Sequence, residues 1–385
     1  MLDTIRRVQS GDFAVTLAVM GLITVGLVTL SGISEPASAG FESQIVRQSV
    51  FVVIGVFLYI TVATIDYRIL SIFAWGGYVF AMLALLLVLF FGVERFGAQR
   101  WFLFGPVQFQ PSEMAKVALI IVLARYFTAL QEVRNSTWTF MGSIALTGIP
   151  VVLVLLEPDL GTSLVFVVIW FCMAFAAGSR LLHMGIIVML GIISAPISWF
   201  VMRPYMRERI ITFIDPTIDP LGSGYNVLQA QIAVGSGGWW GRGIGSSTQS
   251  QLEFLRVRDT DFIFAVVAEQ FGFVGSLVII SLFLIIFLYA LIVVVRAPND
   301  FSRFLAAGIL AMIAFEVLVA IGMNIGLAPV TGITLPLMSA GGSSLVMTLI
   351  ALGILVSVSL HRDVALFHAS SRAELPAGRR AGHRF

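Results

Sequence analysis

Charged residues stand inside or beside apolar stretches of this sequence, where a charge is costly and therefore usually serves a function. Glu113 and Lys116 are three residues apart, so on a helix they share one face at the start of an apolar run. Lys116 is the only lysine of the chain, and its compact ammonium is a good partner for a phosphate. Two interpretations are open: the lysine extends toward water beside a local ion pair, or both residues line a polar cavity.

Two aspartates stand at predicted helix starts. Asp159 lies in the short connection Glu157-Pro158-Asp159, and it either caps a helix or holds a hard divalent cation. Asp261 follows Thr260 ahead of a long apolar run, and it either caps that helix or has a role in a reaction. The residue types alone do not decide between capping and function.

A glycine-rich segment, residues 202–261, is the longest connection between two apolar runs. Within it, Gln229–Val234 has the pattern of a short amphipathic helix, and Trp239 and Trp240 are typical of a membrane surface. Dense glycine lets the backbone approach a ligand closely, although a flexible loop would have the same composition. The sequence contains no Walker-type phosphate loop, no G-x-S-x-G nucleophile elbow and no H-E-x-x-H zinc motif.

Two shorter polar segments lie at the ends of apolar runs. Arg100-Trp101 is either part of an aromatic belt at a membrane surface or a clamp for an anionic head group. Residues 329–344 are rich in Gly, Pro and Ser. A broken backbone between two membrane spans normally lines a cavity rather than lipid, so this segment also indicates a polar site.

The elements that carry these residues are predicted to be membrane helices. Of the 385 residues, 58% are hydrophobic and 11% are charged, with a mean hydropathy of +0.99, whereas a soluble domain carries about 25% charged residues. This composition excludes a soluble, disordered or collagen-like chain. Continuous apolar runs without period-2 alternation indicate helices, and about 20 residues span a hydrocarbon core of about 30 Å. The predicted spans are residues 13–31, 46–64, 69–91, 112–130, 138–156, 160–177, 184–201, 262–295, 304–327 and 343–360.

The predicted fold is an all-α polytopic membrane protein. It has about ten transmembrane helices and a large extracytoplasmic loop, residues 202–261, between the seventh and the eighth. The eighth run is longer than one bilayer crossing. Its first turns, with Glu269 and Gln270, are therefore expected to project above the membrane or to line a cavity.

Arginine positions predict the orientation. If the N-terminus is cytoplasmic, the segments on its side of the membrane hold 13 arginines and the short opposite loops hold three. Because positive loops stay in the cytoplasm, both termini are predicted there, in a multi-pass protein of the cytoplasmic (inner) membrane. The first run, about 19 residues long, is too long for a cleaved signal peptide and is predicted to remain as a helix. The six arginines of the outer loop are the exception to this rule.

The remaining composition limits the domain plan and the partners. Residues 1–362 are predicted to form one transmembrane domain, followed by a basic, disordered cytoplasmic tail at 363–385. The single cysteine, Cys172, excludes an intrachain disulfide and a cysteine metal cluster. A net charge of +2 and four histidines give no indication of nucleic-acid binding.

Several separated sequence segments resemble the SEDS family (shape, elongation, division and sporulation proteins), and they follow one another in the same order as in that family. The resemblance covers residues 12–362, and Pro329–Ile333 looks like the elongation branch, the RodA type, more than the division branch. The matching strings are Gly97–Trp101 with Phe109–Lys116, Glu157–Thr162, Ile232–Gly245 with Thr248–Leu255, Thr260–Gly272 and Gly326–Ser344.

The resemblance implies a ten-span peptidoglycan glycosyltransferase. Such an enzyme polymerises lipid II into glycan strands on the outer face of the cytoplasmic membrane, during cell elongation and shape maintenance. The implied partners are a class B penicillin-binding protein, which crosslinks the strands, and other membrane proteins of the elongation complex. No nucleic acid is implied as a partner.

The resemblance also assigns roles to residues. The essential aspartate of the family falls on Asp261, which is predicted to be the general base of an inverting attack by a sugar hydroxyl. The pyrophosphate leaving group gains negative charge, which basic residues or a divalent cation must neutralise. Arg100 and Lys116, with some arginines of the outer loop, are predicted to hold the pyrophosphates. Asp159 and Glu113 are predicted to position these cations or to coordinate Mg²⁺ or Mn²⁺. The predicted substrate-binding residues are Arg100, Trp101, Glu113, Lys116, Arg209, Gln249, Thr260, Ser343 and Ser344.

The chain departs from the family pattern at a few positions. Ala340 stands where an aromatic residue is common, Ala320 where an asparagine is common, and Leu255–Asp259 differs from the usual Leu-Pro-Glu-Arg-His. None of these changes involves Asp261, although Asp259 is a second acid close to it.

Two other functions are compatible with ten helices and intramembrane charges. One is a lipid II flippase or secondary transporter, which needs polar sites reachable from both sides and often has inverted repeats. The other is a scaffold that recruits a penicillin-binding protein, which would not require an acid beside a basic cavity. The predicted sites cluster at the outer helix ends, which favours the enzyme.

Overall fold

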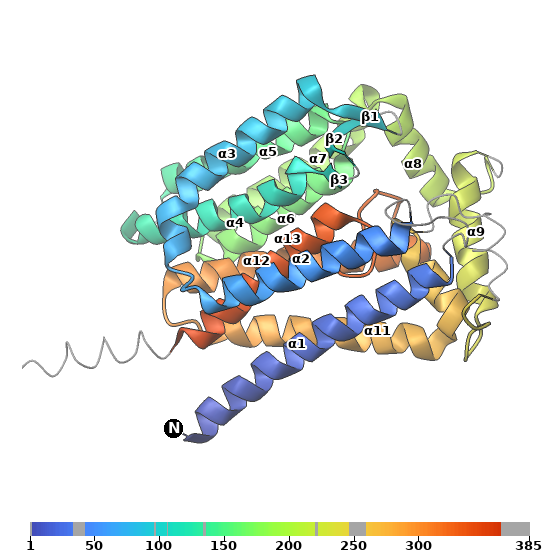
Figure 1. Ribbon diagram of the computed structural model, residues 1–385. Helices are drawn as coiled ribbons and strands as arrows, with labels where there is room; N and C mark the ends of the chain where they lie inside the picture. Colours follow the sequence, from blue (N-terminus) through green and yellow to red (C-terminus); the bar gives the residue numbers. More distant parts are fainter. Residues whose placement is uncertain are drawn as a thin grey trace, which may run out of the picture.

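The computed structural model describes residues 2–33, 43–95, 98–105, 107–133, 136–219, 222–245 and 259–362. Each of the ten predicted spans is a helix in it, so the all-α polytopic fold is confirmed (Figure 1). Seven of the described helices are long and apolar enough to cross a membrane, and α6 and most of α7 are shorter apolar helices. The helices of the bundle are α1 (Leu2–Ser31), α2 (Gln44–Thr64), α3 (Ile69–Phe91), α4 (Pro111–Ala129), α5 (Thr137–Leu156), α6 (Leu160–Ala176), α7 (Leu181–Val201), α11 (Ile263–Val295), α12 (Asp300–Asn324) and α13 (Gly342–Leu360). A short 3-10 turn, η2, covers Gln131–Val133.

A small antiparallel sheet joins α3 to α4, and the sequence patterns do not predict it. It consists of β1 (Val93–Arg95), β2 (Ala98–Phe104) and β3 (Val107–Phe109), in the order β1-β2-β3. In the register, Trp101 lies opposite Val93. The strands are too short to give a clear alternation of apolar and polar residues. The sheet matters because β2 carries Arg100 and Trp101.

In its described part, the large loop between α7 and α11 contains the helices α8 (Pro204–Ile214) and α9 (Ser223–Ser236). The amphipathic segment predicted at Gln229–Val234 lies inside α9. Figure 1 shows α8, α9 and the small sheet at one end of the bundle, opposite the N-terminus and the end of α13. Residues 246–258 of this loop, and the predicted tail at 363–385, lie outside the described residues.

The first turns of α11 pack against the segment that follows α9, and the expectation that Glu269 and Gln270 project above the membrane or line a cavity stays a prediction. Gly272 has a φ of 68°, and a side chain there would collide with the Gly241 backbone nitrogen at 2.3 Å. The segment after α9 crosses α11 at this kink, and the Arg242 N–H donates to the Glu269 carbonyl at 2.9 Å. Glu269 and Gln270 are consequently buried against this segment and α1, and they line none of the cavities described below.

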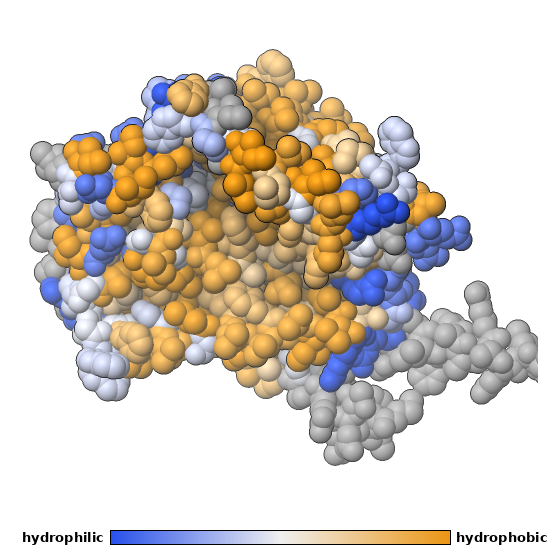
Figure 2. All heavy atoms as spheres, turned by 180° about the vertical axis from the view of Figure 1, so that it is seen from behind, coloured by the Kyte–Doolittle hydropathy of each residue, from blue (hydrophilic) through white to orange (hydrophobic). Residues whose placement is uncertain are grey.

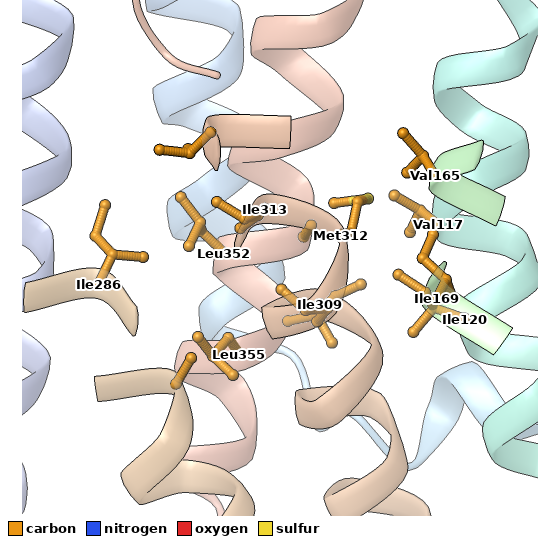
Figure 3. Packing of buried hydrophobic residues seen from close by; sticks show 14 of the residues in the cluster. Val117, Ile120, Val165, Ile169, Ile286, Ile309, Met312, Ile313, Leu352 and Leu355 are labelled. Carbon is orange, nitrogen blue, oxygen red and sulfur yellow. The ribbon is translucent and has the colours of Figure 1, made fainter. Parts of the chain in front are cut away.

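The centre of the bundle is an apolar layer around α12. Ile309 and Met312 of α12 lie among side chains of α4, α6, α11 and α13 (Figure 3). Large apolar side chains such as Ile72 and Phe90 are instead exposed on the outer helices. Figure 2 shows a broad apolar face with hydrophilic side chains gathered toward its two ends. This arrangement holds polar residues at the helix ends and is suited to lipid around the middle.

Candidate active site

Two cavities meet at one end of the bundle. The first, about 720 Å³, lies between α8, α9 and residues 326–330; we call it the outer cavity. The second, about 380 Å³, lies between the small sheet and the ends of α4, α6, α12 and α13; we call it the inner cavity. Arg100, Arg209 and Asp261 line both, so these three residues mark the junction.

Asp261 is not the cap of α11. The N-cap of that helix is Phe262, and it makes no side-chain cap hydrogen bond. Asn324 of α12 serves the helix start instead, because the Ala265 N–H donates to Asn324 Oδ1 at 2.9 Å. Asn324 Nδ2 also donates to the Asp261 carbonyl at 3.0 Å. The cap alternative is therefore unsupported, and Asn324 fixes the Asp261 backbone while the carboxylate faces the cavities.

The surroundings of Asp261 suit a group that accepts a proton near neutral pH. Burial raises the pKa of Asp261 from 3.8 to about 6, against the lowering effects of the Thr260 hydrogen bond and Arg209. The charges of Asp259 and Asp159 act in the same direction as burial. A general base works best when its pKa lies near the working pH.

Arg209 of α8 lies near the carboxylate of Asp261. A Cβ placed on Gly332 would be 3.9 Å from Asp261 Oδ2 and 4.0 Å from Arg209 Nη1, so both side chains reach the same point of the α12–α13 connection. Arg209 Nη1 donates to the Val330 carbonyl at 3.1 Å. This is the only hydrogen bond of the guanidinium to a described residue, and Arg209 lines both cavities at their junction.

Arg100 is held in place by the connection between α5 and α6. Its Nε donates to the Glu157 carbonyl at 3.0 Å, Nη2 donates to the Pro158 carbonyl, and Nη1 lies 3.2 Å from Asp159 Oδ2. Asp159 also caps α6, because the Thr162 N–H donates to Oδ1 at 3.1 Å. The capping interpretation of Asp159 is thus confirmed. The same carboxylate also holds the Arg100 guanidinium at the junction of the cavities.

Lys116 lies between two carboxylates in the inner cavity. Its Nζ is 2.9 Å from Glu113 Oε1 and 2.5 Å from Glu316 Oε1, and all three side chains are buried. Glu316 of α12 is absent from the predicted site residues, although a carboxylate inside the predicted span 304–327 was a visible signal. The Lys116 ammonium is therefore already engaged by two carboxylates, which leaves it poorly placed for direct contact with pyrophosphate.

The predicted metal ligands do not form a ready site. The Glu113 carboxylate faces Lys116, and the Asp159 carboxylate faces Arg100 and Thr162. No group of three or more His, Cys, Asp or Glu that could hold a metal lies together in the described ranges. Mg²⁺ commonly takes one or two carboxylates and completes its shell with substrate phosphates and water. The divalent cation therefore stays a prediction, and the mechanism below does not depend on it.

The other predicted residues that the structure describes gather in the same place. Trp101, Thr260, Ser343 and Ser344 line the inner cavity. Ser343 Oγ accepts from the Gln110 N–H at 3.1 Å and donates to the Gln108 carbonyl at 2.9 Å, so the start of α13 is tied to the small sheet. Gln249 lies outside the described residues.

Glu157, beside Asp159, is a second residue that is absent from the predicted site. Its side chain is 1% exposed, and neither carboxylate oxygen has a hydrogen-bond partner among the described residues. Burial and then the charge of Asp159 raise the pKa of Glu157 from 4.5 to about 8, against the effect of Arg100. The group is therefore protonated at neutral pH and places no second negative charge under Arg100.

Glu157→Gln is expected to stabilise the protein increasingly as pH rises. The folded protein holds the Glu157 proton more tightly than the unfolded chain, so the stability that Glu157 contributes declines between about pH 4.5 and pH 8. Glutamine has the same shape and does not titrate. The melting temperature of the variant in detergent, relative to wild type, should therefore rise from pH 5 to pH 8; a difference that does not change with pH would contradict the assignment.

The helix bundle and the two cavities together define a polytopic membrane protein. At one end it has a site where a buried aspartate lies close to two arginines. The cell cycle protein family of FtsW, RodA and SpoVE matches residues 12–364. The chain is 37% identical over 350 residues to the peptidoglycan glycosyltransferase MrdB of Escherichia coli K12, covering 90% of this chain and 94% of that protein. It is 35% identical over 364 residues to stage V sporulation protein E of Bacillus subtilis 168, covering 91% and 97%. This protein therefore belongs to the FtsW, RodA and SpoVE family, the SEDS family.

Solved structures agree with this membership. The Thermus thermophilus rod shape determining protein RodA superposes with a TM-score of 0.68 at 30% identity, covering 90% of this chain and 96% of that chain. A chain from a peptidoglycan synthase complex, described as coordinating polymerization and crosslinking, gives a TM-score of 0.77 at 32% identity. That match covers 91% of this chain and 98% of the other.

Proposed function

We propose that this protein is a peptidoglycan glycosyltransferase of the RodA type, which polymerises lipid II into glycan strands during cell elongation. The observation that carries the proposal is the position of Asp261, at the junction of two cavities and beside two arginines. The relatives named as peptidoglycan glycosyltransferases support the same activity.

The proposed reaction is a single inverting displacement. The 4-hydroxyl of one sugar attacks the anomeric carbon of another, a new C–O bond forms, and the bond from that carbon to the lipid pyrophosphate breaks. Asp261 takes the proton of the attacking hydroxyl, because a hydroxyl is a weak nucleophile without a base. Arg209 and Arg100 neutralise the charge that grows on the leaving pyrophosphate.

Two substrates must meet at Asp261, and the two cavities provide room for this. Each cavity reaches the junction from a different direction, one under α8 and α9 and the other beside the small sheet. We assign Lys116 a positioning role in the inner cavity, since its ammonium is already held by Glu113 and Glu316.

Orientation and partners follow from the same proposal. The junction would lie on the outer side of the cytoplasmic membrane, because the opposite end carries arginine-rich segments, the N-terminus and the end of α13 (Figure 1). A class B penicillin-binding protein is the proposed crosslinking partner. The match to a chain of a synthase complex that coordinates polymerization and crosslinking supports it.

A divalent cation is proposed to bind the substrate pyrophosphate beside Asp159. When bound, it would supply further positive charge for the leaving group. Removing divalent ions with EDTA is expected to lower the polymerisation rate, and adding back Mg²⁺ or Mn²⁺ to restore it. Asp159→Asn keeps an oxygen for the α6 cap and should raise the metal concentration needed. Polymerisation that is indifferent to EDTA would rule out the metal requirement.

The test of the proposed function is synthesis of glycan chains from purified lipid II by the purified protein. Moenomycin is included, because it blocks the other class of peptidoglycan glycosyltransferase. Chain growth that continues in moenomycin is the expected result. Failure of wild type to extend lipid II, alone and with its partner, would overturn the proposal.

A flippase is the alternative, and the centre of the bundle disfavours it. A transporter needs a polar route between the two membrane faces. Here the apolar side chains around Ile309 and Met312 fill the middle of the bundle (Figure 3). Lipid II that moved across proteoliposomes without being polymerised would favour the flippase.

A further inference from the structure

A third cavity lies at the end of the bundle opposite Asp261. It measures about 250 Å³ and opens between α1, the C-terminal ends of α11 and α13, and the turn that follows α11; we call it the far cavity. The proposed reaction uses no residue of this end. The lining residues that carry the argument are Tyr289, Ile292, Val293, Arg296, Val358 and Arg362.

Two arginines at the rim of the far cavity have no partner in the described part of the chain. Arg296 follows α11 and Arg362 follows α13, and neither guanidinium forms an ion pair or hydrogen bond with a described residue. Two other arginines near the same end are neutralised locally. Arg303 pairs with Asp300 at 2.8 Å, and Arg68 pairs with Asp66 at 3.6 Å. Among the described residues, nothing therefore compensates the charge of Arg296 and Arg362, in contrast to that of Arg68 and Arg303.

The acidic residue beside the cavity does not neutralise this charge. Asp12 of α1 accepts a hydrogen bond from the Tyr289 hydroxyl at 2.5 Å, and it is not within ion-pair distance of either arginine. The cavity walls below the rim are apolar, formed by Ile292, Val293 and Val358. The far cavity therefore combines an apolar interior with two cations at its mouth, at a helix end near the membrane surface.

We propose that the far cavity binds the phosphate group of an anionic phospholipid. Two guanidinium groups can bind phosphate oxygens in bidentate fashion, and the apolar walls fit the glycerol and first acyl carbons. Basic pockets between helices on the cytoplasmic side of membrane proteins recognise anionic head groups in this way. In the proposed orientation this is the cytoplasmic leaflet. The alternative is that each arginine only complements the negative end of its own helix, α11 or α13.

The test is native mass spectrometry of the purified full-length protein with defined lipids. Phosphatidylglycerol and phosphatidylethanolamine are titrated separately, and inorganic phosphate is added as a competitor. The variant is Arg296→Gln/Arg362→Gln. The control is Arg68→Gln/Arg303→Gln, which removes the same charge from the same end but from arginines that are already paired. Melting temperatures in detergent verify that both variants fold.

The proposal expects wild type to retain phosphatidylglycerol over phosphatidylethanolamine. The rim variant should bind phosphatidylglycerol roughly tenfold more weakly or worse, while the control binds like wild type. Displacement by millimolar inorganic phosphate would assign the site to a free phosphate as well as to a lipid. Absence of a lipid preference in wild type, or equal losses in both variants, would leave the arginines as helix-end charges and overturn the site. Because the readout is binding, these results are independent of polymerisation.

Discussion

Asp261→Asn is expected to lower the rate of lipid II polymerisation by about 10² to 10⁴-fold. Asparagine keeps the size and the hydrogen-bond acceptor of the side chain but cannot take the proton of the attacking hydroxyl. The backbone contact from Asn324 to residue 261 does not involve the side chain, so the fold should be retained. The rate is measured as glycan chain length against time, with detergent-purified protein and lipid II.

Asp259→Asn is the matched control. Asp259 is an aspartate in the same turn, but its carboxylate accepts from Gln44 of α2, and it does not line the inner or the outer cavity. Its replacement removes the same charge from a residue outside both cavities and lowers the pKa of Asp261, which is already ionised above about pH 6, so chain growth at neutral pH should stay close to wild type. If Asp259→Asn were inactive and Asp261→Asn were normal, the assignment of the base would be wrong.

Lys116→Met is expected to give the largest loss of stability. It leaves Glu113 and Glu316 buried without a cation, and removing one member of a buried charge cluster costs about 3–5 kcal/mol. The variant should unfold at a clearly lower temperature or denaturant concentration in detergent. Polymerisation should fall with it, because the same residues line the inner cavity.

Two further variants separate the cluster from a general effect of charge removal. Adding Glu113→Gln and Glu316→Gln to Lys116→Met removes all three charges and should recover much of the lost stability. Arg303→Gln breaks a more exposed i,i+3 ion pair with Asp300 and should cost about 1 kcal/mol or less. A Lys116→Met protein as stable as Arg303→Gln would show that the buried cluster is not important.

The membrane helices could be predicted from the sequence because their signal is local. A run of about 20 apolar residues is long enough to cross the hydrocarbon core, and lipid requires the backbone to bond within each helix. The amphipathic segment Gln229–Val234 was predictable for the same reason, and it lies in α9. The elongation branch of the family and the catalytic role of Asp261 were predicted from the resemblance to the SEDS family. The residue types alone left open whether Asp261 caps a helix or takes part in a reaction.

What the sequence could not provide depends on contacts between distant segments. The pairing of Lys116 with Glu316 joins residues 200 positions apart. The burial of Glu269 and Gln270 depends on a loop segment that folds across the kink at Gly272. Asn324 replaces Asp261 as the cap of α11 only because the end of α12 lies against it. None of these partners is visible in local patterning.

The most direct measurement of the central claim is the pH dependence of chain growth under conditions where the chemical step limits the rate. Because the base must be ionised and the pKa of Asp261 is about 6, the wild-type rate should rise about tenfold per pH unit below pH 6 and level off above it. The residual rate of Asp261→Asn should lack this inflection. A wild-type profile that is flat between about pH 5 and pH 7, or an inflection retained in Asp261→Asn, would contradict the role of Asp261 as the general base.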